Sequence, residues 1–169
     1  MHLMKYSLVL VCAAASLGWA QKVDMEFDET VNFANFKTFR IMDGNLNAKA
    51  KMLNNDLSRK KIENEIRLRL TAKHLIEVTT GRPDLAVRYN LGAAQRTETD
   101  VFRGRRGRIR GATKSQTTEG TLTIDLLDGN SRELLWRAVA IEEERDPVKI
   151  QGRLDEMVKK AFDKYPPKK

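Results

Sequence analysis

Hydrophobic and polar residues alternate most regularly between residues 120 and 141, a pattern that predicts a β-hairpin. The first half has the two-residue period of a strand with one buried face, and its apolar positions are Leu122, Ile124 and Leu126. Residues 128–131 are Asp, Gly, Asn and Ser, which favour a turn because they tolerate positive φ or bond their own backbone. A second apolar run, from Leu134 to Ile141, completes the hairpin.

Alternation of the same kind predicts three more half-buried strands, around residues 23–28, 37–42 and 85–91. Residues 92–119 have no apolar period and consist mainly of polar residues, Gly and Arg, so a long Arg/Gly-rich loop is expected there, with or without strand extensions at its two ends. With the two strands of the hairpin, the chain is expected to contain about five strands.

The hydrophobic period lengthens to that of a helix between residues 54 and 75, where Ile62, Ile66 and Leu70 form one apolar stripe. A second helix is expected to begin at Pro147, with Asp146 as its N-cap. Its stripe consists of Ile150, Leu154, Met157, Ala161 and Phe162, and it ends before Pro166 and Pro167.

These elements follow one another in the order ββαβββα. Each helix has one apolar stripe and each strand has one apolar face. The helices and the sheet can bury these apolar surfaces by packing against each other in two layers. The predicted fold class is α+β: a two-layer sandwich in which two helices cover one face of a mainly antiparallel sheet of about five strands. Residues 21–169 are expected to form one domain.

The predicted hairpin leaves some of its apolar residues on the sheet face away from the helices. Alternation assigns four residues to that face: Leu127, Leu135, Val139 and Ile141. The simpler explanation is that local twist and the predicted 92–119 loop cover them. The functional alternative is that they form a surface for a partner.

Residues 1–20 have the features of a secretory signal peptide, with a basic start, an apolar run over residues 6–17 and a cleavage site ending at Ala20. The run is shorter than the roughly 20 apolar residues that span a bilayer. Cys12 raises the alternative of a lipoprotein, but Val11 precedes it where such signals have Gly or Ala. A periplasmic or secreted protein is therefore expected, and anchoring through Cys12 is less favoured.

The chain has a formal net charge of +8. A basic exported protein meets lipid head groups, lipopolysaccharide or acidic polymers before nucleic acid, which is disfavoured as a partner. The most concentrated basic residues, spaced by glycines, are Arg103, Arg105, Arg106, Arg108, Arg110 and Lys114. Arginine makes bidentate contacts with phosphate, so an anion-binding segment is one interpretation. A solvated loop whose charges keep the protein soluble is the other.

Catalytic signals are weak. His74 is the only histidine left after removal of residues 1–20, so neither a histidine metal site nor a Ser-His-Asp triad with a spare base can be assembled. Glu77 is close to His74 in the sequence, but a helix C-cap is the simpler interpretation of this histidine. Phosphate-binding loops and nucleophile elbows are absent from the sequence. The sequence therefore favours a protein without catalytic activity, cofactor or metal.

Several short motifs occur together in a characteristic order. They are the export signal, Lys37-Thr38 within the segment from Phe33 to Phe39, Pro83-Asp84-Leu85, the string over 120–128, Leu135-Trp136-Arg137 and the ending over 162–168. In this respect the chain resembles the bacterial family known as domain of unknown function 4136. The resemblance implies an exported α+β protein, frequently a lipoprotein, with no established activity. This chain departs from the family in its weak lipoprotein signal and in His74, where members often have Gly.

We therefore predict a non-enzymatic binding or structural module of the bacterial cell envelope, whose partner is an envelope protein or a second copy of the chain. The alternative is a protein that binds lipid head groups or lipopolysaccharide through the Arg-rich segment, and an enzyme is the least favoured class. Six residues are expected to have structural roles in the core: Trp136, Ile62, Ile66, Leu70, Leu154 and Phe162.

Overall fold

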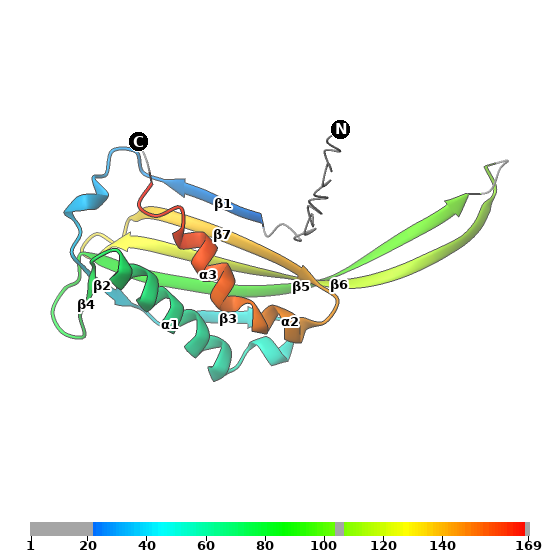
Figure 1. Cartoon of the computed structure of the whole chain (residues 1–169), viewed down its shortest axis with the longest axis horizontal. Helices are drawn as coiled ribbons and strands as arrows, with labels where there is room; N and C mark the ends of the chain where they lie inside the picture. The colour runs from blue at the N-terminus through cyan, green and yellow to red at the C-terminus, as the bar shows by residue number, and fades with distance from the viewer. Residues whose placement is uncertain (1–21, 104–106, 168–169) are drawn as a thin grey trace, which may run out of the picture.

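A computed structural model describes residues 22–103 and 107–167 of the chain (Figure 1). The predicted signal peptide, Cys12, Arg105 and Arg106 lie outside these residues. The fold is α+β, with three helices and one mixed sheet of seven strands. The strands are β1 (Lys22–Phe27), β2 (Thr38–Ile41), β3 (Asn45–Ala48), β4 (Ile76–Glu77), β5 (Leu85–Arg103), β6 (Ile109–Asp128) and β7 (Leu134–Glu144). The helices are α1 (Asp56–Ala72), α2 (Pro147–Gly152) and α3 (Leu154–Phe162), and two 3-10 turns lie at Phe33–Asn35 and Lys51–Leu53.

Strand β5 lies at the centre of the sheet, whose order is β1-β7-β6-β5-β2-β4, with β3 also paired to β5. On one side β5 pairs with β6, and the four strands from β5 to β1 are antiparallel. On the other side β2 and β3 pair with β5 in parallel, and β4 is parallel to β2. The sheet is therefore mostly antiparallel, and all three helices lie on one of its faces (Figure 1).

The number and order of elements differ from the sequence prediction of five strands and two helices. The additional strands β3 and β4 have only four and two residues. In β3 Leu46 and Ala48 alternate with Asn45 and Asn47, but four residues are too few for this alternation to predict a strand. Pairing with β5 stabilises it. The C-terminal helix begins at Pro147 with Asp146 as N-cap, as predicted, but a break at Arg153 divides it into α2 and α3.

The core lies between the helices and the sheet. The six residues expected to have structural roles are all fully buried: Trp136, Ile62, Ile66, Leu70, Leu154 and Phe162. The ring of Trp136 stacks on Phe162 with 5.5 Å between the centroids, and Tyr165 contacts both rings edge-on. Strand β7 and helix α3 are thus joined by aromatic packing.

A bulge changes the alternation of the hairpin formed by β6 and β7. Leu126 is opposite Trp136, but the next pair is Leu127 and Leu134, so Leu135 is an extra residue. The prediction that Leu135 faces away from the helices is wrong, because the bulge places it in the core cluster beside Trp136.

The predicted loop over 92–119 is also wrong. Strands β5 and β6 continue through it as an antiparallel arm that projects beyond the rest of the sheet (Figure 1). Five threonines lie in this segment, where β-branched residues favour extended backbone: Thr97, Thr99, Thr113, Thr117 and Thr118. The segment therefore does not fold over the sheet, and it does not cover the apolar residues assigned to the outer face of the hairpin.

Candidate functional site

The sheet face away from the helices carries a row of charges across four strands. The register places Arg88 of β5 opposite Asp125 of β6, Asp125 opposite Arg137 of β7, and Arg137 opposite Glu26 of β1. Signs alternate along this row, which we call the charge ladder. Opposite charges on directly paired residues stabilise the register of a sheet.

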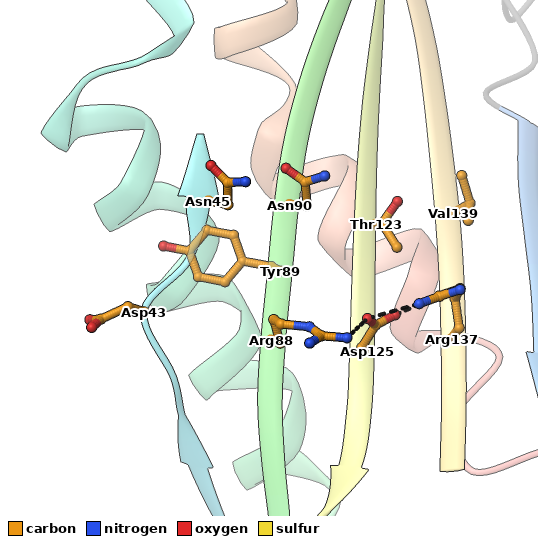
Figure 2. A pocket seen from close by; sticks show the side chains of 9 residues that line it. All are labelled: Asp43, Asn45, Arg88, Tyr89, Asn90, Thr123, Asp125, Arg137 and Val139. Atoms are coloured by element: carbon orange, nitrogen blue, oxygen red, sulfur yellow. Dashed lines mark hydrogen bonds and ion pairs between the residues drawn. The ribbon is translucent and has the colours of Figure 1, made fainter. Parts of the chain in front are cut away.

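Asp125 is the centre of the charge ladder, and Figure 2 shows it between the two arginines. Arg137 donates from Nε to Oδ1 at 2.6 Å and from Nη2 to Oδ2 at 3.0 Å, and Arg88 donates from Nη2 to Oδ2 at 2.9 Å. The remaining contact, from Arg137 Nη1 to Glu26 Oε1, is longer at 3.5 Å. Asp125 is buried, whereas the arginine heads are partly exposed.

Burial alone would raise the pKa of the Asp125 carboxyl, but hydrogen bonds and charge from Arg137 and Arg88 outweigh it and lower the pKa below its ordinary value. The carboxylate is therefore ionised at neutral pH. Its oxygens already accept three hydrogen bonds from guanidinium groups. This arrangement suits a group that holds two arginines in place and does not suit a general base, which needs a pKa near the working pH.

An open groove of about 540 Å³ surrounds the charge ladder. Beyond Arg88, Asp125 and Arg137 it is lined by Asp43, Asn45, Tyr89, Asn90, Thr123 and Val139 (Figure 2). Asn45 pairs with Asn90 and Asn90 with Thr123, so amide and hydroxyl groups form a second row beside the charges. The lining offers hydrogen-bond donors and acceptors to a polar ligand.

Replacing Asp125 by Asn is expected to lower the free energy of unfolding by about 2 kcal/mol at neutral pH, because the charge-assisted hydrogen bonds are lost. The lowered pKa means that this stabilisation is complete above the ordinary carboxyl pKa of about 4 and is lost as the pH falls through the lowered value. Urea unfolding of both proteins between pH 7 and pH 2.5 measures the difference.

The matched control is Asp24→Asn, which removes a carboxylate whose side chain is 62% exposed. It should change the free energy of unfolding by less than about 0.5 kcal/mol. A difference between wild type and the Asp125→Asn variant that stayed constant down to pH 2.5 would show that Asp125 acts by packing and not by its charge.

The end of the arm brings basic and apolar side chains together. Arg103, Arg108 and Arg110 are exposed there, and Lys114, which pairs with Thr99, is exposed nearer the sheet. Three apolar residues accompany them, and their exposed fractions are large: Val101 45%, Phe102 57% and Ile109 68%. The arm end is therefore amphipathic, whereas the basic residues were predicted on a loop.

The four residues proposed from the sequence as a partner surface do not form one exposed patch. Leu127 and Leu135 are each only 6% exposed, and Leu135 belongs to the core. Val139 and Ile141 are half-buried, and Val139 lines the groove.

His74 has a φ of 67°, and its N–H donates to the Thr71 carbonyl at 2.9 Å. These are the features of the helix C-cap that the sequence favoured. Glu77 forms its ion pair with Arg67 at 2.5 Å. Among the residues that the structure describes, no group of three or more His, Cys, Asp or Glu side chains could hold a metal ion.

Sequence reasoning missed the charge ladder. Alternation is consistent with an outward orientation of Arg88, Asp125 and Arg137, but it predicts neither their pairing nor the groove. Only the register of three strands brings them together. A search for oppositely charged residues at facing positions of the predicted hairpin would have found Asp125 and Arg137.

The fold and the groove define a two-layer α+β domain with one sheet face covered by helices and one face open. The family model "Domain of unknown function (DUF4136)" matches residues 23–167. The chain belongs to this family, as the sequence motifs indicated. A search of curated protein sequences finds no match. No helix in the described part of the chain is long and apolar enough to cross a membrane.

Two solved structures share this fold. A DUF4136 family protein from Bacteroides thetaiotaomicron is 13% identical with a TM-score of 0.59, and the match covers 86% of this chain and 96% of that one. A PDZ domain protein from Parabacteroides distasonis is 17% identical with a TM-score of 0.62 over 87% of this chain. The match spans only 36% of the length of that second protein. At these identities the likeness is one of fold.

Proposed function

We propose that this protein is a non-enzymatic binding module of the bacterial cell envelope and that it contacts its partner through the arm. Membership of a family whose proteins are often exported supports the location, together with the signal peptide predicted over residues 1–20. The exposed arm carries the proposal of binding. The groove, whose central carboxylate is occupied by two arginines, gives less support to catalysis.

The arm is unusual because it buries almost nothing within the chain. Residues 94–103 and 107–114 are all exposed, although residues 94–103 pair with the strand that begins at Ile109. A two-stranded hairpin is at best marginally stable by itself, and ordering its backbone costs about 1 to 2 kcal/mol per residue. An extension of this length contributes little to the core, so a role in contacting another molecule accounts for it best.

The test is removal of the arm at a point where the two strands can be rejoined. Residues 96–117 are replaced by Asn-Gly, which closes a two-residue turn between the paired residues Gln95 and Thr118. The thermal midpoint should change by less than about 3 °C because no core residue is removed. Sedimentation with isolated envelope membranes from the source bacterium should be lost.

The control is the Asp125→Asn variant, which alters the groove and leaves the arm intact. It should sediment with the membranes as the wild type does. Equal sedimentation of the arm-deleted protein and the wild type would overturn the proposal that the arm makes the contact.

A further inference from the structure

We propose that the groove on the open face of the sheet is a second binding site and that its ligand is an uncharged oligosaccharide. In this arrangement the saccharide lies across β3, β5 and β6, and its hydroxyl groups exchange hydrogen bonds with Asn45, Asn90 and Thr123. The inference does not rest on the proposed function, because none of the residues that line the groove belongs to the arm.

The three side chains form a row of uncharged polar groups across the groove. Asn45 is paired with Asn90 and Asn90 with Thr123, and Figure 2 shows them on three neighbouring strands. Within the part of the chain that the structure describes, none of the three side chains has a hydrogen-bond partner. An amide and a hydroxyl each offer both a donor and an acceptor, as the hydroxyl groups of a sugar do. Since neighbouring strands are about 4.7 to 4.9 Å apart, the row matches a ligand with several closely spaced hydroxyl groups.

The charges of the groove favour an uncharged ligand. Its lining contains two arginines and two aspartates, so their formal charges cancel. The Asp125 carboxylate already accepts three hydrogen bonds from guanidinium groups and has little left to offer a cation. An anion at the arginines would lie beside this same carboxylate, and like charges at close range repel each other. A neutral saccharide meets neither obstacle.

Arg88 and Val139 complete the site beside the row. Arg88 is held by Asp125 through Nη2, and among the described residues its Nε and Nη1 atoms have no acceptor, so they are available to a ligand. A donor that is already held in place loses less conformational freedom when it binds. Val139 is paired with Thr123 at the end of the row and offers an apolar contact for the C–H groups of a sugar ring. The volume of about 540 Å³ lies in the range of small-molecule sites.

A peptide strand fits the groove less well. Peptides add to sheets along an unpaired edge, where the backbone offers free hydrogen-bonding groups. At the groove β5 is paired with β3 and β6, and β6 is paired with β5 and β7. A ligand in the groove therefore meets side chains and no free strand edge, which favours a saccharide over an extended peptide.

The first measurement titrates the isotope-labelled protein with chitotetraose, an uncharged oligosaccharide, and follows its NMR spectrum. The expected result is a change in the side-chain amide signals of Asn45 and Asn90 and in the methyl signals of Thr123 and Val139. The dissociation constant should be about 1 mM, because the groove is open and the contacts are few. Signals that stay unchanged at about 10 mM saccharide, or that change only elsewhere in the chain, would overturn the inference.

The second measurement tests the charge of the ligand. The deacetylated tetramer, which is cationic, and tetragalacturonate, which is anionic, should each bind at least about tenfold more weakly than chitotetraose. Raising the salt concentration from about 0.05 M to about 0.3 M should change the affinity for chitotetraose less than about twofold, because the ligand has no charge to screen. Tighter binding of tetragalacturonate than of chitotetraose would show that the groove is an anion site and would overturn the inference.

The third measurement removes the polar groups of the row. Asn45→Ala combined with Thr123→Val should weaken chitotetraose binding at least about tenfold, because several hydrogen bonds to the ligand are lost. The matched control combines Asn47→Ala with Thr121→Val, which makes the same two changes in the same two strands, two residues away and outside the lining of the groove. It should weaken binding less than about twofold. Equal losses in the two variants would overturn the assignment of the site.

The arm-deleted protein separates this site from the proposed function. It should bind chitotetraose as the wild type does, because every residue that lines the groove is retained. Loss of saccharide binding on deletion of the arm would overturn the assignment to the groove. If chitotetraose fails to bind although deletion of the arm abolishes sedimentation with envelope membranes, the inference falls and the proposed function stands.

Discussion

Truncation of Trp136 to alanine is expected to lower the free energy of unfolding by about 3 to 5 kcal/mol. The side chain is fully buried, stacks on Phe162 at 5.5 Å between centroids and meets Tyr165 edge-on at 5.5 Å. Its removal would leave a cavity between β7 and α3 that both elements line. Since a whole domain is stable by only about 5 to 15 kcal/mol, the variant should be close to unfolding at 37 °C.

Denaturant unfolding followed by far-UV circular dichroism measures this loss. The conservative variant Trp136→Phe should cost less than half as much, since it keeps a ring against Phe162. It also removes the indole N–H, which is buried without a hydrogen-bond partner among the described residues. Phe102→Ala is the control, because that aromatic residue is 57% exposed. A loss below about 1 kcal/mol for Trp136→Ala would contradict the aromatic packing.

The second large effect is expected from Gly129, in the turn between β6 and β7. A Cβ atom there would lie 1.7 Å from the carbonyl oxygen of Pro83 and 3.0 Å from that of Asp84. The N–H of Gly129 donates to this Asp84 oxygen at 2.8 Å, so the two backbones are held together. Gly129→Ala forces one turn away from the other and should cost about 3 kcal/mol or more.

Gly111→Ala is the matched control, because a Cβ atom at Gly111 would have no atom within 4 Å. Thermal unfolding of the two variants should differ by at least 6 °C, with the Gly111 variant close to the wild type. Similar midpoints for the two variants would show that the turn at Gly129 has room to move.

Hydrophobic periodicity predicted the elements that have one solvent-exposed face and one buried face. The stripe of Ile62, Ile66 and Leu70 and the alternating residues of β6 and β7 belong to this class, and they are buried as expected. The N-cap at Asp146 followed from local chemistry as well, since its side chain accepts from the N–H of Val148. Each of these predictions depends on residues within one element.

The elements that periodicity missed are either exposed on both faces or only two to four residues long. The arm is exposed on both faces, so Thr97 and Glu98 alternate without an apolar period, and only the pairing of β5 with β6 shows that they form a strand. Strand β3 likewise depends on β5, which is distant in sequence. The bulge at Leu135 is evident only from the register of β6 and β7, and it reversed the face assigned to that residue.

The charge ladder shows the same limit for the site. Arg88 and Asp125 are 37 residues apart, and their contact requires the register of two strands that are joined through the arm. The polar character of the open face followed from alternation, but the groove and its ion pairs did not. For the arm end, the sequence identified the basic residues but not the extended geometry that places Phe102 and Ile109 among them.

The pairing of β1 with β7 has a consequence for the order of folding. The first strand enters the sheet only beside the last one, and the pair from Phe27 to Trp136 joins residues at opposite ends of the domain. Contacts of such long sequence separation form slowly, because a large loop must close before they are made. A chain synthesised from its amino end therefore carries Val23, Met25 and Phe27 without a partner strand until β7 has been made. Completion of this sheet is a late event of folding.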